Sequence, residues 1–160
     1  MSPVIRTVIF TVVVPGFWIG LLPWWLARRN RVSLQWDGLA MVGWPLIAFG
    51  AVLYLTCAFW GFALRGGGTP APIDPPKKLV VAGPYRVVRN PMYWAVLFVM
   101  LGESAVLHFA LLAAWGLTFF AGTCLFVLLY EERVLRSSFG AEYEQYCRSV
   151  PRWFPRLKIK

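Results

Sequence analysis

Residues 91–130 read PMYWAVLFVMLGESAVLHFALLAAWGLTFFAGTCLFVLLY, and this stretch decides the fold. It contains two apolar runs, 91–107 and 110–130, each close to the roughly 20 residues that a helix needs to cross a membrane. Only a few residues around His108 separate the two runs, so the helices must form a tight hairpin. The open ends of a hairpin face the same side of the membrane. Residues 65–90 and the tail after the hairpin therefore share one compartment.

The rest of the chain indicates the same class of protein. Of the 160 residues, 59% are hydrophobic and 17% are aromatic, which exceeds ordinary soluble domains. Two earlier apolar runs, near 4–26 and 38–64, are also long enough to span a membrane. The second is long for one crossing and predicts tilting or extension beyond the bilayer. The prolines that predict kinks in these runs are Pro15, Pro23 and Pro45. We expect an all-α integral membrane bundle of about four spans in a single domain, with a cytoplasmic amphipathic helix at the C-terminus.

The basic residues predict the orientation. The chain has 16 Lys and Arg residues, 7 Asp and Glu residues and a formal net charge of +9. The basic residues lie between and after the apolar runs, where they suit anionic lipid headgroups rather than nucleic acid. All but Arg28, Arg29 and Arg31 fall on the shared side of the hairpin, so the positive-inside rule predicts that both termini are cytoplasmic. The first run meets Trp24 and Trp25 without a small-residue cleavage site, which predicts a retained span.

A polar stretch, GPYRVVRNPMYWAV (83–96), stands at the start of the third span. It begins with a Gly-Pro turn, and Pro91 suits the first turn of a helix because its missing N–H costs nothing there. Asn90 is then the predicted N-cap. Arg86 and Arg89 flank this helix start, where exposed N–H groups and the helix dipole favour an anion. The alternative interpretation is that both arginines are interfacial anchors.

A second polar stretch, LYEERVLRSSFGAEYEQYCRSVPRWFP (129–155), follows the fourth span. Glu131 and Glu132 lie where the helix leaves the apolar core, and carboxylates at that depth are costly unless paired or used. A short amphipathic helix is predicted to carry Tyr143 and Tyr146 on one face. Both polar stretches reach the same membrane surface, and together they have the composition of a polar ligand pocket.

The remaining polar residues predict no metal site and no phosphate loop. The cysteines are isolated from one another and are interpreted as small apolar side chains: Cys57, Cys124 and Cys147. His108 alone cannot build a zinc site and is predicted to be a turn residue at the membrane surface. Glu103 lies close enough to the hairpin tip to reach water. The Gly triplet in the loop 66–76 lacks the Lys-Ser/Thr of a phosphate-binding loop.

Together, the two polar stretches resemble the isoprenylcysteine carboxyl methyltransferase family and its bacterial relatives, and more distantly the phospholipid methyltransferases. The similarity covers roughly residues 65–156 and rests on Arg-x-Pro-x-Tyr, the Glu-Glu pair and the tyrosines after Phe-Gly. Asn90 stands where the family has His and cannot titrate near neutral pH. The resemblance implies a multi-pass enzyme of the bacterial inner membrane, with two N-terminal spans in 1–64 and a cofactor-binding half in 65–160.

Family members use S-adenosylmethionine, which the resemblance places at the cytoplasmic ends of the third and fourth spans, covered by the tail. The cofactor's carboxylate suits Arg89, and its ammonium and sulfonium suit Glu131 or Glu132. Its adenine suits an aromatic ring from Tyr93 or from the tail, including Trp153. The implied cofactor-binding residues are Arg89, Asn90, Pro91, Tyr93, Glu131, Glu132, Tyr143 and Tyr146.

The resemblance also implies a lipophilic methyl acceptor. A prenylcysteine carboxylate is already ionised and needs only a cation such as Arg86 or Arg133. A phospholipid amine must lose a proton and would need one of the glutamates as base. The implied catalytic residues are Arg86, Glu132 and Arg133. The missing His at position 90 favours the carboxylate, while a small hydrophobic thiol or amine stays open.

Two other functions stay open. Membrane sterol or enone reductases that use NADPH carry a related Arg-His-Pro-Asn-Tyr element, although Met92 replaces its Asn in this chain. A non-catalytic lipid-binding protein on a methyltransferase scaffold is the second alternative, motivated by Asn90. The expected partners are membrane lipids and a lipophilic or prenylated substrate. The aromatic-rich helices also permit a homodimer.

Overall fold

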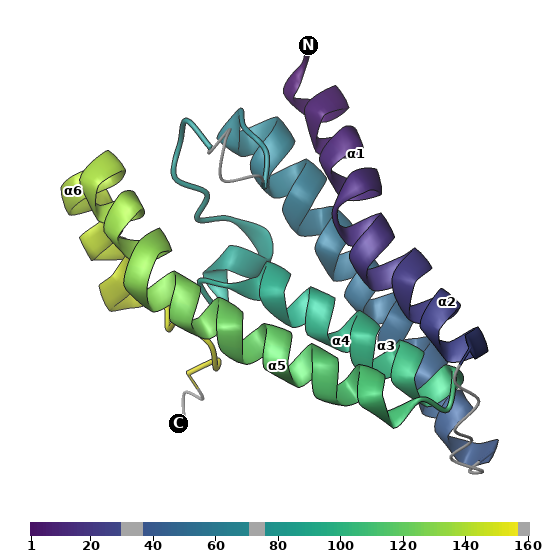
Figure 1. The fold of residues 1–160 in the computed structure, drawn as a ribbon. Coiled ribbons are helices and arrows are strands. Elements are labelled where there is room, and N and C mark those ends of the chain that lie inside the picture. Colours follow the sequence, from purple (N-terminus) through teal and green to yellow (C-terminus); the bar gives the residue numbers. More distant parts are fainter. Residues whose placement is uncertain (30–36, 71–75, 157–160) are drawn as a thin grey trace.

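A computed structural model describes residues 1–29, 37–70 and 76–156, which form helices and no strand (Figure 1). In chain order these helices are α1 (Pro3–Val13), η1 (Gly16–Leu21), α2 (Leu22–Arg29), α3 (Asp37–Leu55), η2 (Thr56–Gly66), η3 (Gly83–Arg86), α4 (Pro91–Val106), α5 (Ala110–Phe126), η4 (Val127–Glu131) and α6 (Glu132–Ser149). η1, η2 and η4 are π-helical segments inside longer helices, and η3 is a 3₁₀ turn. The predicted all-α fold class is confirmed.

Three continuous helices are long and apolar enough to cross a membrane: Pro3–Arg29, Gly38–Gly66 and Ala110–Ser149. A fourth apolar helix, Pro91–Val106, is shorter. The chain is therefore a multi-pass membrane protein, and the predicted runs match these helices within a few residues at nearly every end. Pro15 directly precedes the π-helical segment η1, whereas α3 continues through Pro45.

The helix that carries the last predicted span does not end at residue 130 but continues through η4 into α6, so the polar residues after the span extend the same helix. Its residues after 130 include no glycine or proline before Gly140, so nothing in the backbone stops the helix there. The break comes at Gly140, where φ is 50° and ψ is −122°. After this break Tyr143 and Tyr146 pack against Leu135 of the first half of α6. The predicted amphipathic helix with a buried tyrosine face is thus confirmed.

The hairpin between α4 and α5 turns at His108, which has a left-handed φ of 52°. The backbone N–H of Leu107 donates to the carbonyl of Glu103 and ends α4. The Ser104 hydroxyl donates to the carbonyl of Phe109 at 3.0 Å and fixes the entry into α5. The turn predicted around His108 is confirmed.

Helices α3 and α4 pack more closely than any other pair of helices in the described residues. Their contact runs through glycines. A Cβ on Gly102 would lie 2.7 Å from the carbonyl oxygen of Gly43, and a Cβ on Gly50 would lie 2.6 Å from the carbonyl oxygen of Ala95. Small residues let membrane helices approach until their backbones touch, which gains dispersion energy where lipid offers no hydrophobic driving force. This contact holds α4 firmly against α3.

We expect Gly50→Ala to destabilise the protein by about 1–3 kcal/mol, because its Cβ would meet backbone that cannot move aside. Gly122→Ala is the matched control, since a Cβ there meets nothing within 4 Å. Thermal unfolding in detergent checks both variants. An unchanged midpoint for Gly50→Ala would contradict the close helix contact.

The ends of the helices gather in two groups (Figure 1). The N-terminus, η3 and α6 lie toward one end of the bundle, and the end of α2 and the α4–α5 turn lie toward the other. This agrees with the shared side predicted from the hairpin, whereas the cytoplasmic assignment of that side stays a prediction. Parts of that prediction fall outside the described residues, namely Arg31, Lys158, Lys160 and the loop portion 71–75.

Candidate functional site

A cavity of about 500 Å³ lies between the first helix, α4 and the long α5–α6 helix. On α4 its lining extends from Asn90 to Met100, roughly 15 Å at 1.5 Å per residue. The other walls of this arm are mostly apolar and include Phe10, Val14, Trp18, Ile19, Trp115 and Phe119, with Tyr54 of α3 and Phe62 of η2 also in the lining. The cavity therefore joins a polar end near the start of α4 to an apolar arm along the spans.

The polar end carries groups of both charges. Arg89 and Asn90 reach it from the segment before α4, and Glu131 reaches it from η4. The Tyr93 hydroxyl donates to Glu131 Oε2 at 2.8 Å, which fixes the direction of that carboxylate. Tyr143 also lines this end. The two polar stretches of the sequence thus meet at one cavity, as predicted.

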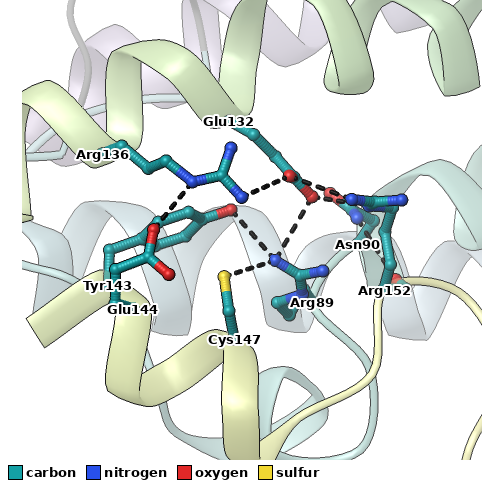
Figure 2. A network of polar contacts seen from close by, with 8 residues as sticks. All are labelled: Arg89, Asn90, Glu132, Arg136, Tyr143, Glu144, Cys147 and Arg152. Atoms are coloured by element: carbon teal, nitrogen blue, oxygen red, sulfur yellow. Dashed lines mark hydrogen bonds and ion pairs between the residues drawn. The ribbon is translucent and has the colours of Figure 1, made fainter.

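Glu132 lies outside the cavity lining, at the centre of a cluster of arginines (Figure 2). Arg152 donates to both of its carboxylate oxygens, with Nε 2.6 Å from Oε1 and Nη2 3.0 Å from Oε2. Arg89 Nη1 lies 3.2 Å from Oε1, and Arg136 Nη2 lies 3.1 Å from Oε2. The side chain of Glu132 is only 3% exposed. Burial of this charged carboxylate without a partner would cost free energy, and the three guanidinium groups compensate for that cost.

These contacts control the charge of Glu132. Burial by itself raises the pKa of this carboxyl group, but the hydrogen bond from Arg152 and the charges of Arg89, Arg152 and Arg136 outweigh it. The pKa of Glu132 therefore lies below its ordinary value, and the group is ionised at neutral pH.

Arg89 connects the arginine cluster to the cavity. Its Nη1 also contacts the Tyr143 hydroxyl at 3.4 Å and the sulfur of Cys147 (Figure 2). Its Nε is buried and has no hydrogen-bond partner in the described part of the chain. Because Arg89 lines the polar end, a ligand there can satisfy this donor.

The chain after α6 forms a C-terminal strap, residues 151–154, along the start of α4. Three successive carbonyls of the strap accept hydrogen bonds: Pro151 O from Arg89 N (2.9 Å), Arg152 O from Asn90 Nδ2 (3.2 Å) and Trp153 O from Trp94 Nε1 (3.0 Å). The Trp153 ring packs edge-on against Phe120 of α5, with centroids 5.2 Å apart. The strap therefore ties α4 to α5 next to the cavity.

Asn90 is the N-cap residue of α4 by position, but its side chain makes no capping hydrogen bond. The amide instead donates to the strap at the carbonyl of Arg152. The predicted position is thus confirmed, whereas the predicted capping contact is wrong: capping would use the side-chain oxygen, and the amide is instead oriented by its hydrogen bond to the strap. Pro91 is at the start of α4, as predicted.

The structure brings together most of the predicted site residues. Those that line the cavity are Arg89, Asn90, Tyr93, Glu131, Tyr143 and Tyr146. Pro91 and Glu132 do not line it, although both lie directly beside residues that do. Arg86 and Arg133 are exposed and are not among the lining residues. The roles of all these residues stay predictions.

Sequence reasoning missed Arg152, which no motif singles out within SVPRWFP. It also did not identify the residues of the apolar arm, because their aromatic side chains look like any lipid-facing side chains in the sequence. Of the four aromatic residues offered for adenine stacking, Trp153 is not among the lining residues, whereas Tyr93, Tyr143 and Tyr146 are. Within the described ranges no group of three or more His, Cys, Asp or Glu side chains is placed to hold a metal ion.

The fold and the site define a multi-pass membrane protein whose cavity extends from a charged end to an apolar arm. A model of the phospholipid methyltransferase family matches residues 39–142, more than half of the chain. The chain belongs to this family of membrane methyltransferases, which confirms the resemblance found in the sequence.

Two relatives are known by name. The cobalt-zinc-cadmium resistance protein CzcN of Cupriavidus metallidurans is 29% identical over 150 residues, covering 90% of this chain and 64% of that protein. The nickel-cobalt-cadmium resistance protein NccN of Alcaligenes xylosoxydans xylosoxydans is 33% identical over 82 residues, covering 51% of this chain and 38% of that protein. The chain thus spans less than two thirds of either relative. No solved structure matches the chain with significance.

Proposed function

We propose that the protein is an S-adenosylmethionine-dependent methyltransferase that acts on a lipophilic acceptor in the membrane. One observation carries this proposal: a single cavity joins a charged end, near the start of α4, to an apolar arm between the spans. A methyltransferase for a lipophilic acceptor needs both parts, because its cofactor is polar and its acceptor is not. Family membership favours this function over an NADPH-dependent reductase.

The residues at the polar end fit the cofactor. The buried Nε of Arg89 lacks a partner among the described residues and suits a carboxylate. Glu131 presents a carboxylate to the same end and suits an ammonium or sulfonium. Tyr93, Tyr143 and Tyr146 line the same cavity, and aromatic rings suit a base or a cation. S-adenosylmethionine supplies an activated methyl group on its sulfonium, so the protein mainly has to align the acceptor and exclude water.

The charges at the cavity bear on the class of acceptor. The cations expected to hold a carboxylate, Arg86 and Arg133, are not among the residues that line the cavity. Arg89 does line it, but its Nε is assigned to the carboxylate of the cofactor, and the charge of Glu131 disfavours a carboxylate on the acceptor. An acceptor that gives up a proton, such as an amine, a thiol or a hydroxyl, is therefore better supported than the carboxylate favoured by the sequence. Glu131 with its Tyr93 hydrogen bond is the proton acceptor that this proposal assigns.

The packing of the helices supports entry of the acceptor from the lipid. α5 packs along α4, whereas α1 packs against η2, and contacts between α1 and α5 are sparse at most in the described residues. The apolar arm lies between the first helix and α5, and its lining includes Trp18 of η1 and Trp115 of α5. A hydrocarbon tail can reach the arm sideways through this gap. The names of the two relatives concern resistance to metal ions and do not specify a methyl acceptor.

Titration calorimetry of the detergent-purified protein with S-adenosylhomocysteine tests the proposal. We expect saturable binding of this demethylated product and none of NADPH, which is the parallel control. Binding of NADPH alone would support a reductase instead. Binding of neither would leave a lipid-binding protein on a methyltransferase scaffold, and binding without turnover of any lipid amine, thiol or carboxylate would support the same alternative.

A further inference from the structure

The two adjacent glutamates take different environments. Glu131 lines the cavity and receives one hydrogen bond, from Tyr93. Glu132 lies outside the lining and receives hydrogen bonds or ion pairs from Arg89, Arg136 and Arg152. Successive residues of a helix point about 100° apart, so the helix can turn only one of the pair toward the cavity. Something must therefore fix the rotation of this segment.

The helix itself leaves that rotation weakly determined. Val127–Glu131 is the π-helical segment η4, directly before Glu132. A π-helical turn accommodates an extra residue and shifts the facing of every residue that follows. The orientation of α5 before this segment therefore does not determine whether Glu131 or Glu132 faces the cavity. Contacts made by the side chains have to select it.

Arg152 makes the most complete contact with Glu132. It alone of the three arginines donates to both carboxylate oxygens, at 2.6 and 3.0 Å (Figure 2). Arg89 reaches only Oε1, at 3.2 Å, and Arg136 is shared with Glu144 and is 44% exposed. A bidentate guanidinium fixes the plane of a carboxylate as well as its position.

Arg152 is itself held in place by the strap. Its carbonyl accepts the hydrogen bond from Asn90 Nδ2, and the carbonyls on either side of it accept from Arg89 N and Trp94 Nε1. These donors belong to the start of α4, which the glycine contact fixes against α3. Arg152 thus links Glu132 to α4, which is packed closely against α3.

We propose that Arg152 is a positioning residue of the cofactor site, which holds Glu132 in the arginine cluster so that Glu131 is the carboxylate facing the cavity. This inference rests on the proposed function, because it concerns the residues assigned to the cofactor. Arg152 does not touch the cavity and acts only through Glu132. Asn90 assists by holding the strap rather than by contacting the cofactor.

The test is a double-mutant cycle on the full chain, with affinity for S-adenosylhomocysteine as the readout. We expect Arg152→Gln to weaken binding roughly tenfold, equivalent to about 1.4 kcal/mol. Glu132→Gln, which keeps the shape of the side chain, is expected to weaken it to a similar extent. If Arg152 acts through Glu132, the double variant binds no worse than Glu132→Gln alone. Additive losses would overturn the proposal.

Two controls separate positioning from general stability. Arg148→Gln removes an exposed arginine nearby and should leave the affinity unchanged. Arg152→Lys keeps the charge without the planar guanidinium and should recover part of the affinity. If Arg152→Gln does not fold, this variant still tests the proposal. Unfolding midpoints are measured in parallel, and a lower midpoint with normal affinity would overturn the proposal. Failure of the wild type to bind would overturn the proposed function as well, whereas normal binding by Arg152→Gln would overturn only this inference.

Discussion

Glu132→Ala is expected to destabilise the protein by about 3–5 kcal/mol, the typical cost of removing one partner from a buried ion pair. The reason is the arginine cluster around Glu132, which loses its central negative charge. The largest part of this cost is expected at Arg89, because its side chain is only 9% exposed and its charge would stay buried without a partner. Thermal or denaturant unfolding in detergent measures the loss.

Glu144→Ala is the matched control for this variant. Glu144 also pairs with Arg136, but its side chain is 49% exposed, so we expect a loss of no more than about 1 kcal/mol. Equal losses from both variants would contradict the central role of Glu132 in the cluster.

The stabilising effect of Glu132 should also depend on pH. The pKa of Glu132 is lower in the folded protein than in the unfolded chain, so its contribution is fully present above the unfolded value and is lost as the pH falls through the folded value. The difference in stability between the wild type and Glu132→Ala should therefore narrow below about pH 4. A constant difference down to lower pH would argue against an ionised Glu132.

Glu131→Gln is expected to weaken binding of S-adenosylhomocysteine roughly 10- to 100-fold while the protein stays folded. Glu131 faces the cavity and is assigned to the cationic groups of the cofactor, so the loss of its charge acts on the ligand. Within the described residues Glu131 accepts a hydrogen bond from the Tyr93 hydroxyl, which a glutamine at this position can still accept. Calorimetric titration, together with the unfolding midpoint, measures both effects.

The control for Glu131→Gln is Glu142→Gln, which removes an exposed carboxylate from α6 without touching the cavity. It should bind as the wild type does. Normal binding by Glu131→Gln would show that the cofactor lies elsewhere, and the assignment of the polar end would then fail.

The spans and the hairpin were predictable from the sequence because length and hydropathy determine them. The short gap around His108 leaves no other topology for 91–130, and the structure has the turn there. The continuation of the last helix beyond residue 130 was not predictable from hydropathy, which reports only where apolar residues end. The glycine contact between α3 and α4 was also missed, since Gly43 and Gly102 acquire meaning only once the helices are paired.

The candidate site was predictable in its membership but not in its geometry. The polar stretches contain the residues that meet at the cavity, such as Arg89 and Glu131. Which residues face inward depends on helix rotation through η4 and on the strap, and neither leaves a periodic signal. Arg86 and Arg133 were therefore predicted to hold the acceptor, although they do not line the cavity as Arg89 does.

The shortness of α4 bears on the depth of the polar end of the cavity, which is the proposed cofactor site. With 16 residues at 1.5 Å each, α4 is about 24 Å long, whereas the hydrocarbon core is about 30 Å thick. If its far end reaches the opposite interface, its first turn begins roughly 6 Å below the headgroup boundary. In the proposed methyltransferase the polar cofactor would then bind at the depth of the acceptor, because Arg89 and Glu131 line the cavity beside this first turn. A lipophilic acceptor can consequently be modified without leaving its own depth in the bilayer.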